Sequence, residues 1–128
     1  MDRLFTFIAT ALIFWAGNLT KVKAEIMNKE IQLVQDWDKT FPKSEKVNHE
    51  KVTFKTQYGL TLAADLYIPK SAEGKLPAIA VSGPFGAVKE QCSGLYAQTM
   101  AERGFVTIAF DPSYTGESSG EPRRTASP

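Results

Sequence analysis

Residues 76–111 read LPAIAVSGPFGAVKEQCSGLYAQTMAERGFVTIAFD, and this stretch decides the fold. It begins with LPAIAVSG, a run whose two faces are both apolar, as expected of a strand buried between layers of helices. Residues 93–103 predict a helix, because apolar side chains recur close to helical spacing at Leu95, Met100 and Ala101. Gly104 follows where a helix should end, and FVTIAFD is a second short apolar strand. The order strand, helix, strand predicts a right-handed crossover that makes the two strands parallel.

A pattern of period two precedes this unit. Residues 51–56, KVTFKT, alternate apolar Val52 and Phe54 with polar neighbours, and residues 60–69, LTLAADLYIP, alternate in the same way. Gly59 lies between the two runs, so they predict an antiparallel β-hairpin. The predicted fold class is therefore α/β, with a β-hairpin followed by one βαβ unit of a mostly parallel sheet. One such unit leaves sheet edges and helix faces uncovered, and the fold is expected to be incomplete.

The N-terminus has the features of a targeting segment. Arg3 precedes the apolar run LFTFIATALIFWAG, which is shorter than the roughly 20 residues that span a bilayer. Val22 and Ala24 are the small residues expected before a cleavage point. We predict a signal peptide over residues 1–24, hence export to the periplasm or the medium, with membrane contact limited to the signal peptide. An uncleaved interfacial anchor is the alternative.

Residues 25–46 are predicted to be a short helix and a linker. Within residues 28–40, three-residue spacing of apolar side chains favours an amphipathic helix, with Ile31, Val34 and Trp37 on one face. The polar stretch around Pro42 then leads to a domain expected over residues 47–128.

Composition narrows the classes of function. The chain has 128 residues and a net charge of +1, and without residues 1–24 it would hold 12 basic (15 − 3) and 13 acidic (14 − 1) side chains. No basic stripe indicates a nucleic-acid partner. Cys92 is the only cysteine, so neither an intrachain disulfide nor a cysteine-based metal site can form, and we expect the thiol to be buried. No metal or other cofactor is predicted.

In ordered succession, three segments resemble the N-terminal part of an α/β-hydrolase, in the secreted branch close to dienelactone hydrolase-like and X-Pro dipeptidyl-peptidase-like proteins. They are VTFKTQYGLTLAADLYIP, LPAIAVSGPFGAVKEQCSGLYAQTMAERGF and VTIAFDPSYTGESSGEPR. Residues 1–46 lie outside the resemblance. Single-domain proteins of this kind need roughly 200–250 residues. The resemblance therefore implies that this chain is the N-terminal portion of a larger hydrolase.

The loop that begins at Gly83 is the first candidate for a catalytic role. In the family that it resembles, this loop donates one backbone N–H to the oxyanion formed during acyl transfer. Pro84 has no N–H, so the resemblance implies that Phe85 or Gly86 is the donor. The alternative is a plain strand-to-helix turn that needs glycine for its geometry. Lys89-Glu90-Gln91 follows and looks like a family signature, for which the sequence indicates no chemical role.

Two residues after the second parallel strand look catalytic but are interpreted as structural. Asp111 ends its strand where open α/β sheets place functional groups, yet in the resembled family it more often orders its own loop. Ser118 lies in GESSG, which matches the G-x-S-x-G pattern of serine nucleophiles. That pattern requires a strand-turn-helix, whereas EPRRTASP follows, and no histidine comes after Ser118. His49, the only histidine, is placed before the first strand and away from this loop.

The resemblance therefore implies an exported serine hydrolase that acts on an ester, lactone or amide carbonyl through an acyl-enzyme. The nucleophile, the acid and the histidine of the triad are expected beyond residue 128, and the chain as given is expected to be inactive. A small-molecule ester, lactone or peptide is the expected substrate of the full-length protein. The alternative is a non-catalytic periplasmic binding or interaction module. One form of this alternative is a module that an uncleaved N-terminus anchors to the membrane.

Overall fold

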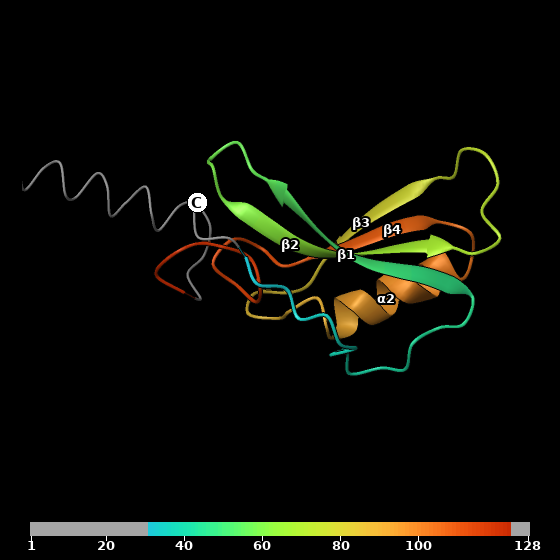
Figure 1. Cartoon of the computed structure of the whole chain (residues 1–128), viewed down its shortest axis with the longest axis horizontal. Helices are drawn as coiled ribbons and strands as arrows, with labels where there is room; N and C mark the ends of the chain where they lie inside the picture. Colours follow the sequence, from blue (N-terminus) through green and yellow to red (C-terminus); the bar gives the residue numbers. More distant parts are fainter. Residues whose placement is uncertain (1–30, 124–128) are drawn as a thin grey trace, which may run out of the picture. The chain divides into compact units, whose positions relative to one another are not determined.

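The computed structural model describes residues 31–123, and these form one mixed β-sheet with a helix against it (Figure 1). The elements are β1 (Val47–Lys55), β2 (Thr61–Pro69), β3 (Ala78–Ser82), α2 (Cys92–Ala101) and β4 (Val106–Phe110). The spatial order of the strands is β1-β2-β4-β3. The predicted signal peptide, residues 1–24, lies outside the described residues. No helix of the described part is long and apolar enough to span a membrane.

Both predicted supersecondary units are present. β1 and β2 pair antiparallel from Val47 opposite Pro69 to Lys55 opposite Thr61, and Gly59 takes a φ of 78° in the turn between them. β3 and β4 pair in parallel across the crossover through α2. β2 pairs antiparallel with β4, which joins the hairpin to the βαβ unit. The predicted α/β class, with a β-hairpin followed by one βαβ unit, is confirmed.

One face of the sheet is covered by α2, which packs against β2, β3 and β4. The core on this side is built from small and aromatic residues: Val47, Tyr67, Ala97, Ala101 and Ala109. Most of the buried residues of α2 are small, namely Ser93, Gly94, Ala97 and Ala101, and the longer side chain of Gln98 is buried where it bonds to the N-terminal segment. Leu95, which helical spacing assigned to the apolar face, is 46% exposed, so that assignment is wrong.

In β1, the apolar side of the alternation, with Val52 and Phe54, points away from the face that α2 covers. The other side of the strand points toward that face. Register with β2 places Val47, His49 and Lys51 on the face that also holds Tyr67. Phe54 lies on the other face, is 39% exposed, and meets Phe110 edge-on at a ring-centroid distance of 6.3 Å. Strand alternation was correctly predicted, but the charged side of β1 faces the core because it has ionic partners there.

The N-terminal arm, residues 31–46, lies on the same side of the sheet as α2 (Figure 1). The helix predicted over residues 28–40 is not formed in residues 31–40. The backbone N–H groups of Val34 and Thr40 donate instead to Glu117 and to the carbonyl of Glu90. Phe41 of the arm is buried against Gly94 of α2. Tertiary hydrogen bonds and packing therefore replace the local helix, and residues 28–30 lie outside the described part.

Candidate active site

Two loops follow the parallel strands at their carboxyl ends and enclose an open cavity of about 750 Å³. The first, the β3–α2 loop (residues 83–91), contributes Phe85, Gly86 and Val88. The second, the β4 loop (residues 111–123), contributes Tyr114, Thr115, Gly116 and Arg123. This edge is where open α/β sheets bind their ligands, because the loops of neighbouring parallel strands meet there.

The two oxyanion candidates lie on the wall of this cavity. Gly86 has a φ of 82°, in the left-handed region that favours glycine, and a Cβ there would meet nothing within 4 Å. Phe85 is 79% exposed. Within residues 31–123, neither backbone N–H donates a hydrogen bond, whereas the next one, of Ala87, donates to the carbonyl of Pro84. Both amides are thus free to donate, and their role in catalysis stays a prediction.

Lys89 organises the polar centre behind the cavity. Its side chain is fully buried, and its ammonium donates to Glu90, to Asp111 Oδ2 at 2.9 Å and to Glu117 Oε2 at 2.6 Å. Burial alone would lower the pKa of Lys89, but the carboxylates around it raise the pKa above its ordinary value. The Lys89-Glu90 pair, for which the sequence indicated no role, is therefore the junction of the two loops.

Asp111 joins the same two loops through its carboxylate. Oδ1 accepts the backbone N–H of Lys89 at 2.8 Å, and Oδ2 accepts the backbone N–H of Glu117 at 3.0 Å. The aspartate is completely buried. The prediction that Asp111 orders its own loop is confirmed, and the structure adds that it orders the β3–α2 loop as well.

Glu117 connects the β4 loop to the N-terminal arm and to β1. Its Oε1 accepts the backbone N–H of Val34 at 2.7 Å, and its Oε2 accepts the ammonium of Lys51 at 2.9 Å. Burial would raise the pKa of Glu117, but hydrogen bonds from Lys89, Val34 and Lys51 outweigh it and lower the pKa. Glu117 lies inside GESSG, and the G-x-S-x-G pattern predicts no role for the residue at this position.

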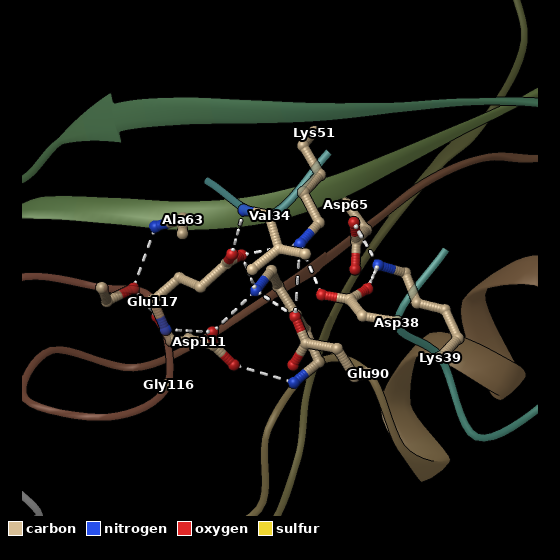
Figure 2. A network of polar contacts seen from close by, with 12 residues as sticks. Val34, Asp38, Lys39, Lys51, Ala63, Asp65, Glu90, Asp111, Gly116 and Glu117 are labelled. Carbon is tan, nitrogen blue, oxygen red and sulfur yellow. Dashed lines mark hydrogen bonds and ion pairs between the residues drawn. The ribbon is translucent and has the colours of Figure 1, made fainter. Parts of the chain in front are cut away.

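The network continues along the arm (Figure 2). Asp38 accepts the ammonium groups of Lys39 at 2.7 Å and Lys51 at 2.8 Å. Burial would raise the pKa of Asp38, but these two hydrogen bonds lower it to about 2. Lys39 also lies 3.1 Å from buried Asp65, which is bonded to Nε2 of His49 at 2.8 Å. His49 is in β1 rather than before it, and serves this cluster instead of a triad.

Three carboxylates of the network, Asp38, Glu90 and Glu117, have oxygens within 4.8 Å of one another. Such a set could hold a cation, but the ammonium groups of Lys51 and Lys89 lie among them and neutralise them. The arrangement is an ion-pair cluster, and we assign no metal to it.

Ser118 has the geometry of a structural residue. It is 1% exposed, its hydroxyl donates to the carbonyl of Asp111 at 2.7 Å, and it accepts the backbone N–H of Ala63 at 2.9 Å. A nucleophile must instead be presented to a cavity beside a general base. The bonds of Ser118 pin the β4 loop to β2, which supports its interpretation as a non-reacting residue.

Cys92, the first residue of α2, is exposed rather than buried as expected. The side chains on the inner surface of α2 begin at Ser93 and Gly94 instead. The prediction of a buried thiol is therefore wrong, and Cys92 takes no part in the cavity.

Comparison with known proteins places this geometry in a family. The family model described as X-Pro dipeptidyl-peptidase (S15 family) matches residues 58–127, which include both loops of the cavity. The chain belongs to this family. S15 membership agrees with the resemblance drawn from the hairpin, the βαβ unit and the β4 loop.

Relatives of this S15-family chain are longer than it. Uncharacterized protein PA2218 of Pseudomonas aeruginosa is 72% identical over 102 residues, which are 79% of this chain and 28% of that protein. Uncharacterized protein YcjY of Escherichia coli is 49% identical over 71 residues, 54% of this chain and 23% of the relative. The chain thus spans less than a third of the length of these relatives.

Solved structures show the same fold. The crystal structure of hypothetical protein PA2218 matches with a TM-score of 0.72 and 73% identity, over 75% of this chain and 30% of that one. The α/β hydrolase GrgF from Penicillium sp. matches with a TM-score of 0.51 and 36% identity, over 59% of this chain and 25% of that one. The sheet and α2 therefore correspond to part of an α/β-hydrolase domain.

Proposed function

We propose that this chain is the N-terminal part of an exported serine hydrolase that acts on ester, lactone or amide carbonyls through an acyl-enzyme. The observation that carries the proposal is the pair of unbonded backbone N–H groups, of Phe85 and Gly86, on the wall of the cavity. Donors of this kind stabilise the oxyanion of a tetrahedral intermediate, and in a water-poor site each is worth roughly 3–4 kcal/mol. S15-family membership supports the same reaction class.

The nucleophile is proposed to lie beyond residue 128, on a strand that pairs with β3. In the described sheet β3 is an end strand, and the β3–α2 loop follows it directly. A strand added at that edge, parallel to β3, would end beside this loop and place a serine next to Phe85 and Gly86. The triad acid and histidine are proposed to follow the serine in the chain.

In the proposed reaction, the serine hydroxyl attacks the carbonyl carbon while the histidine takes its proton. The carbonyl oxygen becomes an oxyanion that accepts hydrogen bonds from the loop amide. The histidine then returns the proton to the leaving group, and an acyl-serine remains. Water activated by the same histidine hydrolyses this ester and regenerates the enzyme.

The substrate class follows from the cavity and the reaction together. Phe85, Val88 and Tyr114 give the wall an apolar part, while the amides of the β3–α2 loop provide the polar part. A small ester, lactone or peptide, with its carbonyl at the loop and an apolar group against the side chains, fits this division. Export is proposed from residues 1–24, and a mature protein beginning at Glu25 in the periplasm or medium would support it.

A fluorophosphonate probe, which labels activated serines covalently, tests the proposal. The full-length gene product should be labelled and should hydrolyse p-nitrophenyl acetate, whereas residues 25–128 alone should do neither. Ser118→Ala in the full-length protein should keep both properties. Absence of labelling in a folded full-length protein would contradict the proposal and favour the non-catalytic binding module. If a folded Ser118→Ala variant lost labelling, Ser118 would be the nucleophile, and the proposal of a nucleophile beyond residue 128 would be wrong.

A further inference from the structure

We infer that Asp111, together with Lys89, is a positioning residue that holds the oxyanion-binding amides of the β3–α2 loop against the β4 loop. The inference rests on the proposed function, because it assigns a role to residues that do not themselves touch the substrate. It goes beyond loop ordering, since it predicts that a buried carboxylate behind the cavity controls the rate of the chemical step.

The tip of the β3–α2 loop has little support of its own. Between Gly83 and Lys89, the backbone hydrogen bonds of the described residues are local: the N–H of Ala87 donates to the carbonyl of Pro84, and the N–H of Gln91 donates to the carbonyl of Val88. The side chain of Phe85 is mostly exposed and cannot fix the backbone by packing. The direction of the free amides therefore depends on how the two ends of the tip are anchored.

The first anchor is Gly83, which packs closely on the start of α2. A Cβ at Gly83 would lie 3.0 Å from the Cβ of Ala87 and 3.6 Å from the hydroxyl of Ser93. The second anchor is Lys89, three residues after Gly86. Its backbone N–H and its ammonium both donate to Asp111, at 2.8 Å and 2.9 Å, so neither the main chain nor the side chain of Lys89 can shift alone.

The same carboxylate fixes the opposite wall of the cavity. Oδ2 of Asp111 accepts the N–H of Glu117, and a Cβ at Gly116 would lie 2.1 Å from that oxygen. Gly116 lines the cavity, as Gly86 does. One buried carboxylate thus determines the separation of the amide donors from the opposite wall, where the substrate must lie.

Catalysis by amide donors is sensitive to such positioning. A donor acts on the oxyanion at about 2.7–3.1 Å, and a displacement of about 1 Å can cost about a hundredfold in rate. A displaced loop weakens a bond that is made fully only in the transition state, so it lowers kcat and leaves KM nearly unchanged.

Asp111→Asn in the full-length protein tests the inference. The asparagine carbonyl can still accept the N–H of Lys89, but its NH₂ group faces two donors, the ammonium of Lys89 and the N–H of Glu117. Asp65→Asn is the matched control, because Asp65 is equally buried and ion-paired but bonds to Lys39 and His49 and not to either loop. Both variants are expected to lower Tm, so a stability loss by itself does not separate them.

Three readouts separate them. Per fluorophosphonate-titrated site, Asp111→Asn should lower kcat for p-nitrophenyl acetate by about 10- to 100-fold with KM within about twofold. Affinity for an aryl trifluoromethyl ketone, which forms an oxyanion adduct with the serine, should fall by the same factor as kcat/KM. Hydrogen exchange in peptides covering residues 83–91 should accelerate. Asp65→Asn should leave all three close to wild type.

Two kinetic results would each overturn the inference: wild-type kcat per site in Asp111→Asn, or an equal loss of kcat in Asp65→Asn. A wild-type protein that neither binds the probe nor turns over substrate would instead overturn the proposed function. Hydrogen exchange distinguishes the two failures, because it reports whether Asp111 holds residues 83–91 whatever the activity. Unchanged exchange there in Asp111→Asn would also reject the positioning role.

Discussion

Lys89 meets Asp111 at both of its ends: its backbone nitrogen lies 2.8 Å from Oδ1 and its side-chain nitrogen 2.9 Å from Oδ2. Both residues are fully buried, so solvent screens this pair weakly. The bond from the backbone N–H alone would fix only the main chain of the β3–α2 loop, and the ion pair alone would only neutralise the buried carboxylate of Asp111. Together they make the β3–α2 loop and the β4 loop one mechanical unit.

Lys89→Met should destabilise the protein strongly, because it leaves Asp111 and Glu117 without their shared ammonium. Removing one member of a buried pair costs about 3–5 kcal/mol of unfolding free energy. Urea denaturation followed by circular dichroism measures the loss. Lys75, which is exposed, provides the control: Lys75→Met should change the free energy of unfolding by less than about 0.5 kcal/mol.

A double-mutant cycle sharpens this expectation. If the pair is coupled, Lys89→Met combined with Asp111→Asn should cost less than the sum of the two single changes, because the unpaired charge is removed. Strict additivity would show that Lys89 acts through packing and not through its charge.

Ser118→Ala should cost about 1–3 kcal/mol of stability, since the buried N–H of Ala63 loses its acceptor. Ser119→Ala is a matched comparison: Ser119 accepts the N–H of Thr61 at 2.8 Å but is less buried, so its loss should be smaller. Chemical denaturation of both variants checks the order. An equal or larger loss in Ser119→Ala would mean that burial of Ser118 does not set the cost.

Acid should weaken the attachment of the N-terminal arm. The pKa of Asp38 is about 2 in the folded state against 3.8 as its ordinary value, and the pKa of Glu117 is lowered as well. A depressed carboxyl pKa stabilises the fold above the unfolded value, and this stability is lost as the pH falls through the folded value. The contribution of Asp38 should therefore disappear between about pH 4 and pH 2.

Unfolding free energies measured at several pH values across this interval test the assignment. Asp38→Asn should flatten the pH dependence there. Asp36→Asn, which changes an exposed carboxylate two residues away, should leave it as in the wild type. A pH dependence unaltered by Asp38→Asn would show that other groups release the arm.

Gly94→Ala should destabilise the protein although alanine favours helices over glycine by about 1 kcal/mol. A Cβ at this position would lie 2.2 Å from the carbonyl oxygen of Lys89 and 3.1 Å from the ring of Phe41. A lower Tm is expected, and Tyr96→Ala on the exposed side of α2 should change Tm little. A raised Tm in Gly94→Ala would contradict the close approach of α2 to the loop and the arm.

Much of the fold could be predicted from the sequence because it depends on local patterns. The period-two run before Gly59 and the apolar runs on either side of residues 93–103 determine the hairpin and the βαβ unit. The orientation of β1 could not be predicted in this way, since Lys51 faces the covered side only because Asp38 and Glu117 meet it there. Partners this far apart in sequence leave no periodic signal.

The residues of the candidate site also differ in whether they could be predicted from the sequence. Phe85 and Gly86 could be named as candidates because the resemblance to α/β-hydrolases implies an amide donor in the loop after the first parallel strand, and their catalytic role stays a prediction. Lys89 and Glu117 could not be assigned, because each looks like an ordinary loop charge until three chain segments come together. A signal was present, however: Lys89 and Asp111 follow successive parallel strands, whose carboxyl ends meet at one edge of the sheet.

The bond between Val34 and Glu117 joins residues 83 positions apart and sets an order of events during synthesis. The arm leaves the ribosome early, but its acceptor emerges only after all four described strands have been made. Until then Trp37 and Phe41 have no completed surface to cover, and closing so long a chain segment is slow compared with forming the hairpin. The arm should therefore be the last part of this region to dock, and the nascent chain should expose both aromatic rings to chaperones until the β4 loop appears.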